Sequence, residues 1–112
     1  MVAFRILLPA EDAELLINAT AVGMWPHADG SIWPEAAAMP THLTIFDLVY
    51  NPLETRLLQQ ARQSGARAID GLNMLIMQGA RSFELWTGEP APVDAMRSAC
   101  AGALERMKGE ER

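Results

Sequence analysis

A polar side chain, Gln78, lies a single turn beyond the largely apolar start of the helix that is predicted to follow Gly71. Its carboxamide offers both a hydrogen-bond donor and an acceptor, which suits ring hydroxyls or a carboxylate. A buried helix rarely carries a glutamine without a partner, because an unpaired buried amide costs free energy. Gly71 permits either close approach of a ligand to the backbone or a positive φ, although glycine before a helix is also a common turn residue.

Polar and aromatic residues also follow two predicted strands. Asn18 and Thr20 come after the apolar run Leu15–Ile17, and Tyr50 closes the second strand, Leu43–Tyr50. Ligands of open α/β sheets bind in the crevice beyond the carboxyl ends of the strands. The residues alone leave alternatives open. Asn18 and Thr20 either satisfy loop backbone groups or form part of a site, and Tyr50 is either a core aromatic with its hydroxyl in water or a ligand contact.

A parallel sheet with helices is needed to position these residues. The apolar strands suit a parallel sheet, and a strand, helix and strand at this spacing require a parallel pair. Three prolines and two glycines within residues 21–42 predict a long loop with a short turn at Pro34–Ala38. The remaining elements are predicted at Glu54–Gln63 (helix, ended by Gly65), Arg67–Asp70 (strand), Leu72–Trp86 (helix) and Val93–Met107 (helix). We therefore expect one α/β domain over residues 1–112, with about three parallel strands and C-terminal helices.

The large apolar side chains are interpreted as packing residues. The tryptophans are not interleaved with basic residues, as single-stranded nucleic-acid binding would require. In the predicted helix Glu54–Gln63, Leu57 and Leu58 face inward, whereas Gln60 lies outside. Cys100 is read as small packing filler, and His27 and His42 lack the spacing of a metal site, so no metal is assigned. The residues assigned to the interior are Trp25, Trp33, Trp86, Met39, Met74, Met77, Met96, Ala99, Ala103 and Met107.

Composition excludes several classes of function. The net charge is −5 and the nine basic residues are scattered, which argues against nucleic-acid binding. No apolar run approaches the roughly 18 residues that span a bilayer, so we expect no membrane insertion. The first residues lack a basic region and a clear cleavage site, and a single cysteine forms no intramolecular disulfide. The expected compartment is the cytoplasm.

Three motifs together resemble the C-terminal part of shikimate dehydrogenase, over roughly residues 12–100. They are Asn18–Met24, Phe46–Thr55, and Asp70–Ala80 closing with Phe83–Gly88, in the order and approximate spacing of that family. The resemblance implies a partial Rossmann-like three-layer unit. It also implies an oxidoreductase that moves a hydride between NADP and a cyclohexene carboxylate, within aromatic amino-acid biosynthesis.

The resemblance assigns roles to seven residues. It implies that Tyr50 and Gln78 bind the substrate, a shikimate-like small molecule. It assigns the nicotinamide side of NADP to Thr20, Met24, Leu48, Gly71 and Met74. Asp47 is interpreted as structural. Asn73 stands where the family commonly has a second glycine, and its side chain either crowds the cofactor or points away.

Several residues of the family are missing from this chain. The family uses a lysine paired with an aspartate from its N-terminal domain, whereas the only lysine here is Lys108. The glycine-rich turn that seats a pyrophosphate is also absent. We therefore assign no catalytic residue and expect the isolated chain to be inactive without a complementing N-terminal polypeptide. The first strand becomes a sheet edge that Val2–Leu8 covers; otherwise we expect a homo-oligomer or a partner chain.

Two functions from different classes stay open. The first is a shikimate dehydrogenase-like NADP-dependent oxidoreductase that interconverts 3-dehydroshikimate and shikimate, present as a C-terminal fragment. The alternative is a non-catalytic ligand-binding or interaction module derived from that family. The sequence does not distinguish shikimate from quinate as the ligand.

Overall fold

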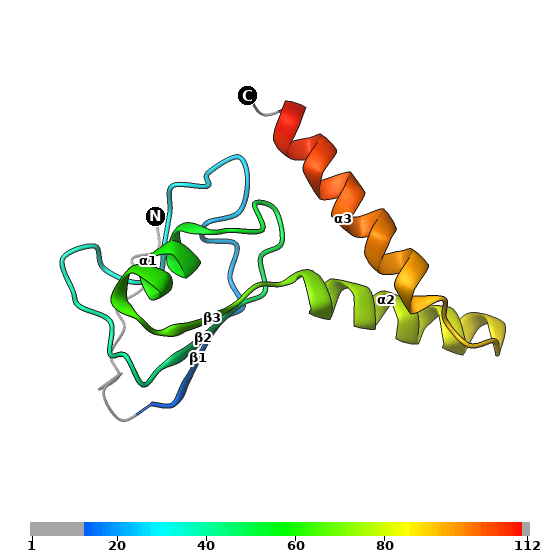
Figure 1. Ribbon diagram of the computed structural model, residues 1–112, viewed down its shortest axis with the longest axis horizontal. Helices are drawn as coiled ribbons and strands as arrows, with labels where there is room; N and C mark the ends of the chain where they lie inside the picture. Colours follow the sequence, from blue (N-terminus) through cyan, green and yellow to red (C-terminus); the bar gives the residue numbers. More distant parts are fainter. Residues whose placement is uncertain (1–12, 111–112) are drawn as a thin grey trace. The chain divides into compact units, whose positions relative to one another are not determined.

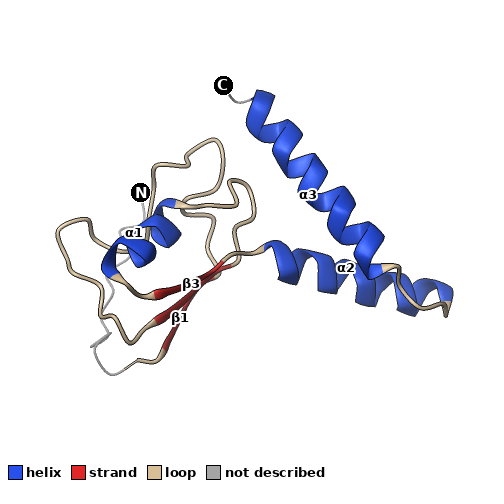
Figure 2. Cartoon of the chain, in the orientation of Figure 1, coloured by secondary structure: helices blue, strands red, loops and turns tan. Residues whose placement is uncertain are grey.

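Three strands and three helices form an α/β fold, seen in a computed structural model that describes residues 13–110 (Figure 1; Figure 2 separates helices from strands by colour). In chain order the elements are β1 (Leu15–Asn18), β2 (Thr44–Asp47), α1 (Arg56–Ser64), β3 (Arg67–Ile69), α2 (Leu72–Thr87) and α3 (Val93–Glu110). The predicted fold class is confirmed. The chain divides into two compact units between Asp70 and Gly71, and each is described by itself. The prediction of one domain over residues 1–112 stays a prediction.

The first unit is built on a parallel sheet of order β1-β2-β3. β2 is shorter than the predicted segment 43–50. The cause is the side chain of its last residue, because Asp47 Oδ1 accepts the Val49 N–H at 3.0 Å and turns the chain out of the sheet. Leu48 to Tyr50 therefore belong to a loop beyond the strand, which places them at the carboxyl edge of the sheet.

α1 covers one face of this sheet. The helix begins two residues later than predicted because the hydroxyl of Thr55 caps it by accepting the Leu58 N–H at 3.3 Å. It ends at Gly65, whose φ of 82° confirms the predicted glycine cap. Its inner face packs on the sheet in one apolar core, whose buried members are Trp33, Met39, Leu43, Ile45, Leu57, Leu58, Ala61 and Ala66.

The connection from β1 to β2 contains no helix over residues 19–43 and is instead held against α1 by side chains. Gln60 is buried, and its Nε2 donates to the Trp33 carbonyl at 3.2 Å while its Oε1 accepts from the Ser31 hydroxyl. The prediction that Gln60 lies on the outside of its helix is therefore wrong. The loop covers that side of α1, a long-range contact that helical periodicity does not report. The predicted turn at Pro34 is confirmed by the Ala37 N–H, which donates to the Pro34 carbonyl at 3.2 Å.

The opposite face of the sheet is open in the described part of the chain. Leu15 and Ile17 on β1, with Ile69 on β3, are exposed there, whereas Leu16 points toward the core. Alternation along a strand places successive side chains on opposite faces, which explains this pattern. The prediction that Val2–Leu8 cover the edge at β1 falls outside the described residues.

The second unit is a pair of packed helices. α2 and α3 are joined by the turn after Gly88, whose φ of 71° ends α2. Gly79 lies at the contact, where an added Cβ would meet the end of the Met96 side chain at 3.4 Å. The helix pair exposes several residues that the sequence assigned to the interior, namely Trp86, Met74, Met77, Ala99 and Met107. Two helices can bury only one side of each, so helical spacing overestimated the interior here.

No helix within residues 13–110 combines the length and apolarity needed to cross a membrane.

Candidate functional site

Two polar side chains end neighbouring strands at the carboxyl edge of the sheet. Asn18 and Asp47 are the last residues of β1 and β2, and they are paired in the register of the sheet. Both are buried, with exposed fractions of 1% and 0%. Asn18 Nδ2 donates to Asp47 Oδ1 at 3.0 Å, so the ends of the two strands are joined through side chains as well as backbone. Two loops leave the sheet from this pair: residues 19–25 and residues 48–54, called here the edge loops.

The first edge loop is folded around Asn18 and Thr20. Asn18 Oδ1 accepts the Thr20 hydroxyl at 2.6 Å and the Thr20 N–H at 3.1 Å, and its Nδ2 also donates to the Val22 carbonyl at 3.1 Å. The Thr20 hydroxyl in turn accepts the Val22 N–H at 3.1 Å. These bonds agree with the interpretation that both side chains satisfy loop backbone groups. They do not test the role of Thr20 toward a cofactor, which stays a prediction.

Gly23 is required by the geometry of this loop. Its φ is 91°, a conformation that L side chains rarely adopt, and an added Cβ would lie 2.9 Å from the Gly30 carbonyl oxygen. The tight approach of Gly23 to Gly30 sets the direction of the next residue, Met24, whose side chain is 46% exposed. An exposed thioether beside this edge can make van der Waals contact with a flat ring.

The second edge loop carries Leu48 and Tyr50 on either side of a buried valine. Val49 points inward and its N–H is held by Asp47 Oδ1, while Leu48 is half-buried and Tyr50 is 43% exposed. The alternative interpretation of Tyr50 as a core aromatic is therefore wrong. Its phenol is accessible at the carboxyl edge, where it can donate or accept a hydrogen bond.

A backbone hydrogen bond joins the two edge loops. The Trp25 N–H donates to the Asn51 carbonyl at 2.8 Å, and each of these residues precedes a cis-proline, Pro26 and Pro52. Trp25 is 50% exposed, so its assignment to the interior is wrong. The structure thus brings together four of the predicted site residues on two linked loops of the first unit. It also places Trp25 beside them. The sequence signal for Trp25 is its position directly after Gly23 and Met24.

The other three predicted site residues lie near the start of α2 in the second unit. Gly71, Met74 and Gln78 are three and four residues apart, a spacing that places them on one side of a helix. Gly71 has φ of −85°, so the positive φ considered for it is wrong. Met74 is exposed.

Gln78 and Asn73 have partners within the helix pair. Gln78 is exposed, so the premise of a buried glutamine is wrong, and its Nε2 donates to the Leu75 carbonyl one turn earlier at 3.0 Å. Asn73 Oδ1 accepts from Arg97 of α3 at 3.1 Å, which directs this side chain toward α3. The Gln78 carboxamide keeps its oxygen as an acceptor for a ligand group.

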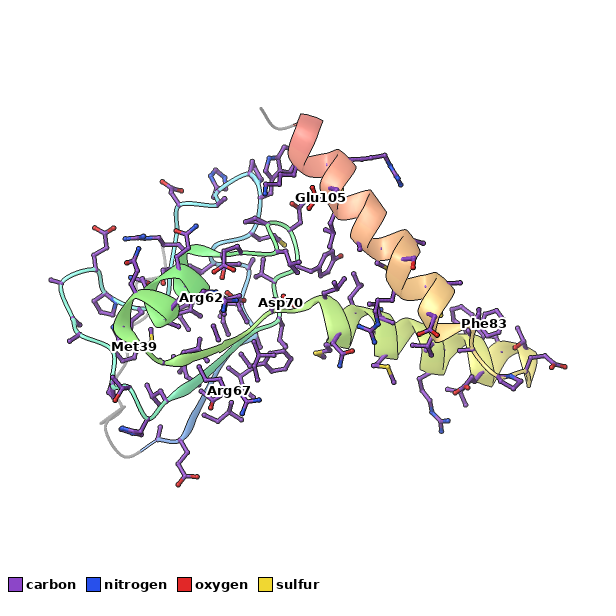
Figure 3. The ribbon with its side chains drawn as sticks, in the orientation of Figure 1. Met39, Arg62, Arg67, Asp70, Phe83 and Glu105 are labelled. Carbon is purple, nitrogen blue, oxygen red and sulfur yellow. The ribbon has the colours of Figure 1, made fainter. Side chains whose placement is uncertain are left out.

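Electrostatic interactions elsewhere in the first unit are at the surface. Figure 3 labels Arg62 on α1, where its Nε donates to Glu54 Oε1 at 2.9 Å. This hydrogen bond and the charge of Glu54 raise the pKa of the Arg62 guanidinium above its usual value. The pair is exposed, and it joins Glu54 at the end of the second edge loop to α1. Within residues 13–110, no group of three or more His, Cys, Asp or Glu side chains is placed to hold a metal ion.

The residues of the edge loops fit the nicotinamide half of a dinucleotide better than its phosphates. Exposed Met24 and half-buried Leu48 offer apolar surface at the edge of the sheet, beside the polar Thr20. A pyrophosphate is usually held by the free N–H groups of a helix that directly follows a strand. The connection from β1 to β2 contains no such helix, and in α1 the Leu58 N–H is already taken by Thr55. α2 does follow β3 after two residues, and no side chain caps its start at Gly71.

Comparison with known proteins gives consistent matches. The family model described as the shikimate 5'-dehydrogenase C-terminal domain matches residues 71–100. The shikimate dehydrogenase (NADP(+)) of Methanosarcina mazei is 50% identical over 94 residues, covering 84% of this chain and 33% of that protein. The protein of the same name from Methanopyrus kandleri is 52% identical over 97 residues, covering 87% of this chain and 32% of that protein. The chain therefore spans about a third of the length of the curated relatives it matches.

Solved structures give the same match. A shikimate dehydrogenase crystallised with NADP+ superposes with a TM-score of 0.78 at 37% identity, over 87% of this chain and 34% of that one. The shikimate 5-dehydrogenase of Thermus thermophilus, in complex with NADP(H) and shikimate, gives a TM-score of 0.75 at 41% identity, over 87% of this chain and 38% of that one. These neighbours have the Rossmann-like fold expected from the sequence.

Proposed function

We propose that this chain, a member of the shikimate dehydrogenase family, supplies the nicotinamide side and part of the substrate side of an NADP-dependent oxidoreductase. It matches the C-terminal part of the proteins in that family. The reaction is the interconversion of 3-dehydroshikimate and shikimate. NADP supplies a hydride acceptor or donor when bound, and the protein must orient the two rings and move a proton.

A single observation carries this proposal. The buried pair of Asn18 and Asp47 holds two edge loops at the carboxyl edge of a parallel sheet, and both loops present exposed side chains there. That edge is where open α/β sheets bind ligands. Curated relatives named shikimate dehydrogenase (NADP(+)), at about half identity, support the chemical class of the ligands.

The residue roles follow the resemblance. We propose that the Tyr50 hydroxyl and the Gln78 carboxamide hydrogen-bond the substrate, since both groups are exposed and can donate and accept. Contacts to the nicotinamide end of NADP are proposed for Thr20, Met24, Leu48, Gly71 and Met74.

We propose that the group that transfers the proton lies outside the described residues. Removing a hydride from a secondary alcohol leaves a proton that a base must take, and the reverse reaction needs an acid. Tyr50 is the one ionisable side chain proposed to touch substrate, and Lys108 lies in the last turns of α3. We propose that a lysine and an aspartate of a complementing N-terminal polypeptide perform this step, and that the isolated chain does not turn over.

A second candidate is a ligand-binding module without redox chemistry. It is favoured by one observation: the connection from β1 to β2 contains no helix that could seat a pyrophosphate, while the exposed Tyr50 and Gln78 side chains are available to a small polar molecule. Such a module binds shikimate without a requirement for NADP.

Two experiments separate these functions. The first assays NADP-dependent oxidation of shikimate by the chain alone and with the N-terminal two-thirds of a family member added in trans. Activity only in the mixture supports the oxidoreductase, activity of the chain alone contradicts the proposed source of the proton-transfer groups, and a silent mixture favours the binding module.

The second experiment follows amide resonances of the labelled chain during titration with shikimate and, separately, NADP+. Tyr50→Phe and Gln78→Ala are each expected to raise the dissociation constant for shikimate by about ten-fold, the usual loss of affinity for one hydrogen bond to a ligand. Gln63→Ala is the matched control, because Gln63 is also an exposed helical glutamine but lies on α1. Equal responses of the Gln78 and Gln63 variants would contradict the role of Gln78, and no response of the wild type to either ligand would contradict both functions.

A further inference from the structure

Asp47 is a fully buried acidic residue that accepts hydrogen bonds from three separate segments. The donors are Asn18 Nδ2 at the end of β1 (3.0 Å), the Val49 N–H in the second edge loop (3.0 Å) and the Thr55 hydroxyl at the start of α1 (2.7 Å). Its exposed fraction is 0%. A carboxylate accepts through two oxygens and donates nothing, so it suits a place where three donors converge.

The position of this side chain separates it from the apolar core. The core lies between α1 and the sheet and consists of apolar side chains, whereas the oxygens of Asp47 face the edge loops. An apolar residue of similar size at position 47 would leave the amide of Asn18 and the hydroxyl of Thr55 without this buried acceptor. The carboxylate is therefore tied to the loops beyond the strand.

We infer that Asp47 is a positioning residue for the edge loops. Through the Val49 N–H it fixes the short segment that presents Leu48 and Tyr50 on either side. Through Asn18 it fixes the loop that carries Thr20 and Met24, because Asn18 itself holds three groups of that loop. One buried carboxylate thus sets the placement of four side chains, those of Thr20, Met24, Leu48 and Tyr50. Their contacts with cofactor or substrate rest on the proposed function.

The test compares three variants of the full chain by amide hydrogen exchange and by resonance positions. Asp47→Ala removes both acceptor oxygens. Asp47→Asn keeps Oδ1, which accepts from both Val49 and Asn18, and exchanges Oδ2, the acceptor of the Thr55 hydroxyl, for a donor. Leu43→Val, directly before the start of β2, trims a buried core side chain and serves as the control for loss of stability alone.

The expected result for Asp47→Ala is exchange of the Val49 amide at least about ten-fold faster than in Leu43→Val, with displaced resonances at Thr20 and Val22. Asp47→Asn is expected to restore the protection of Val49 to within about three-fold of wild type. If the Ala variant does not fold, the comparison of Asp47→Asn with Leu43→Val decides. Retained protection of Val49 and unchanged resonances at Thr20 and Val22 in the Asn variant, with changes confined to Thr55, support the inference. Faster exchange spread over the first unit, as in Leu43→Val, overturns it.

Uniform faster exchange across the first unit in Asp47→Ala, matching that in Leu43→Val, also overturns the inference, because it shows a role in stability only. The titrations with shikimate and NADP+ test the proposed function separately from this inference. A wild-type chain that binds neither shikimate nor NADP+, yet shows the specific response to Asp47→Ala, contradicts the proposed function and leaves the positioning role of Asp47 supported.

Discussion

The two units hold their candidate residues in different ways. In the first unit, Thr20, Leu48 and Tyr50 lie on loops whose shape depends on buried side-chain hydrogen bonds converging on Asp47. In the second unit, Met74 and Gln78 project from α2, and the backbone of the helix alone sets their spacing. A loop site thus needs a residue that orients it, whereas a helical site needs only the correct register. Substitutions outside the ligand contacts are expected to matter far more in the first unit.

Gly23→Ala gives the severest test of this contrast. The positive φ and the 2.9 Å approach of the added Cβ to the Gly30 carbonyl oxygen are expected to lower the free energy of unfolding of the first unit by about 3 kcal/mol. Urea unfolding followed by circular dichroism measures this, with Gly109→Ala as the control, since an added Cβ at Gly109 meets nothing within 4 Å. A loss below that of the control would show that the first edge loop tolerates rearrangement.

Thr55→Ala is expected to cost about 2 kcal/mol, because it removes the cap of α1 and leaves Asp47 Oδ2 without its donor. Thermal unfolding of the variant measures the loss. Thr55→Ser keeps the hydroxyl and is expected to retain most of the stability. Equal losses in the two variants would assign the effect to the missing methyl group rather than to the hydrogen bonds.

Gly79→Ala is expected to change stability in the opposite direction to Gly23→Ala. Gly79 lies in the interior of α2, where alanine favours the helix by about 0.5 to 1 kcal/mol, and its added Cβ meets only the flexible end of Met96. Urea unfolding checks the sign. A clear loss would mean that Met96 cannot move, and that the helix pair is packed as tightly as the edge loops.

Gln78→Ala is expected to give the smallest effect, a change within about 0.5 kcal/mol, since the side chain is exposed and bonds only within its own helix. Differential scanning calorimetry beside the Gln63→Ala control measures it. A loss several times larger would indicate that Gln78 supports the helix pair, and any loss of shikimate binding would then need a different explanation.

The strands, the helices and the glycine cap of α1 followed from apolar runs, spacing and turn residues, because these signals are local. One error arose where a distant segment intervened, and another from a local side-chain contact. Gln60 is buried by the connection from β1 to β2, and β2 ends early because the side chain of its own last residue captures a backbone N–H. The spacing of apolar residues along the sequence indicates neither contact.

The candidate site was predictable in part. Motif resemblance named residues that the structure places at the carboxyl edge, with Tyr50 accessible there. The exposure of Trp25 and the convergence of three donors on Asp47 could not be predicted, since each depends on partners far along the chain or on the path of a loop rich in proline. The hydrogen bond that occupies Gln78 Nε2 was equally hidden, because a helical pattern does not fix side-chain rotamers.

The anchoring of the β1 to β2 connection on Gln60 has a consequence for synthesis on the ribosome. The partners that order this connection, Gln60 and the apolar residues of α1, come later in the chain than the connection itself. Loop closure before those partners emerge would lose entropy with no compensating contacts. We therefore expect the full order of this connection to be acquired only after α1 has left the exit tunnel.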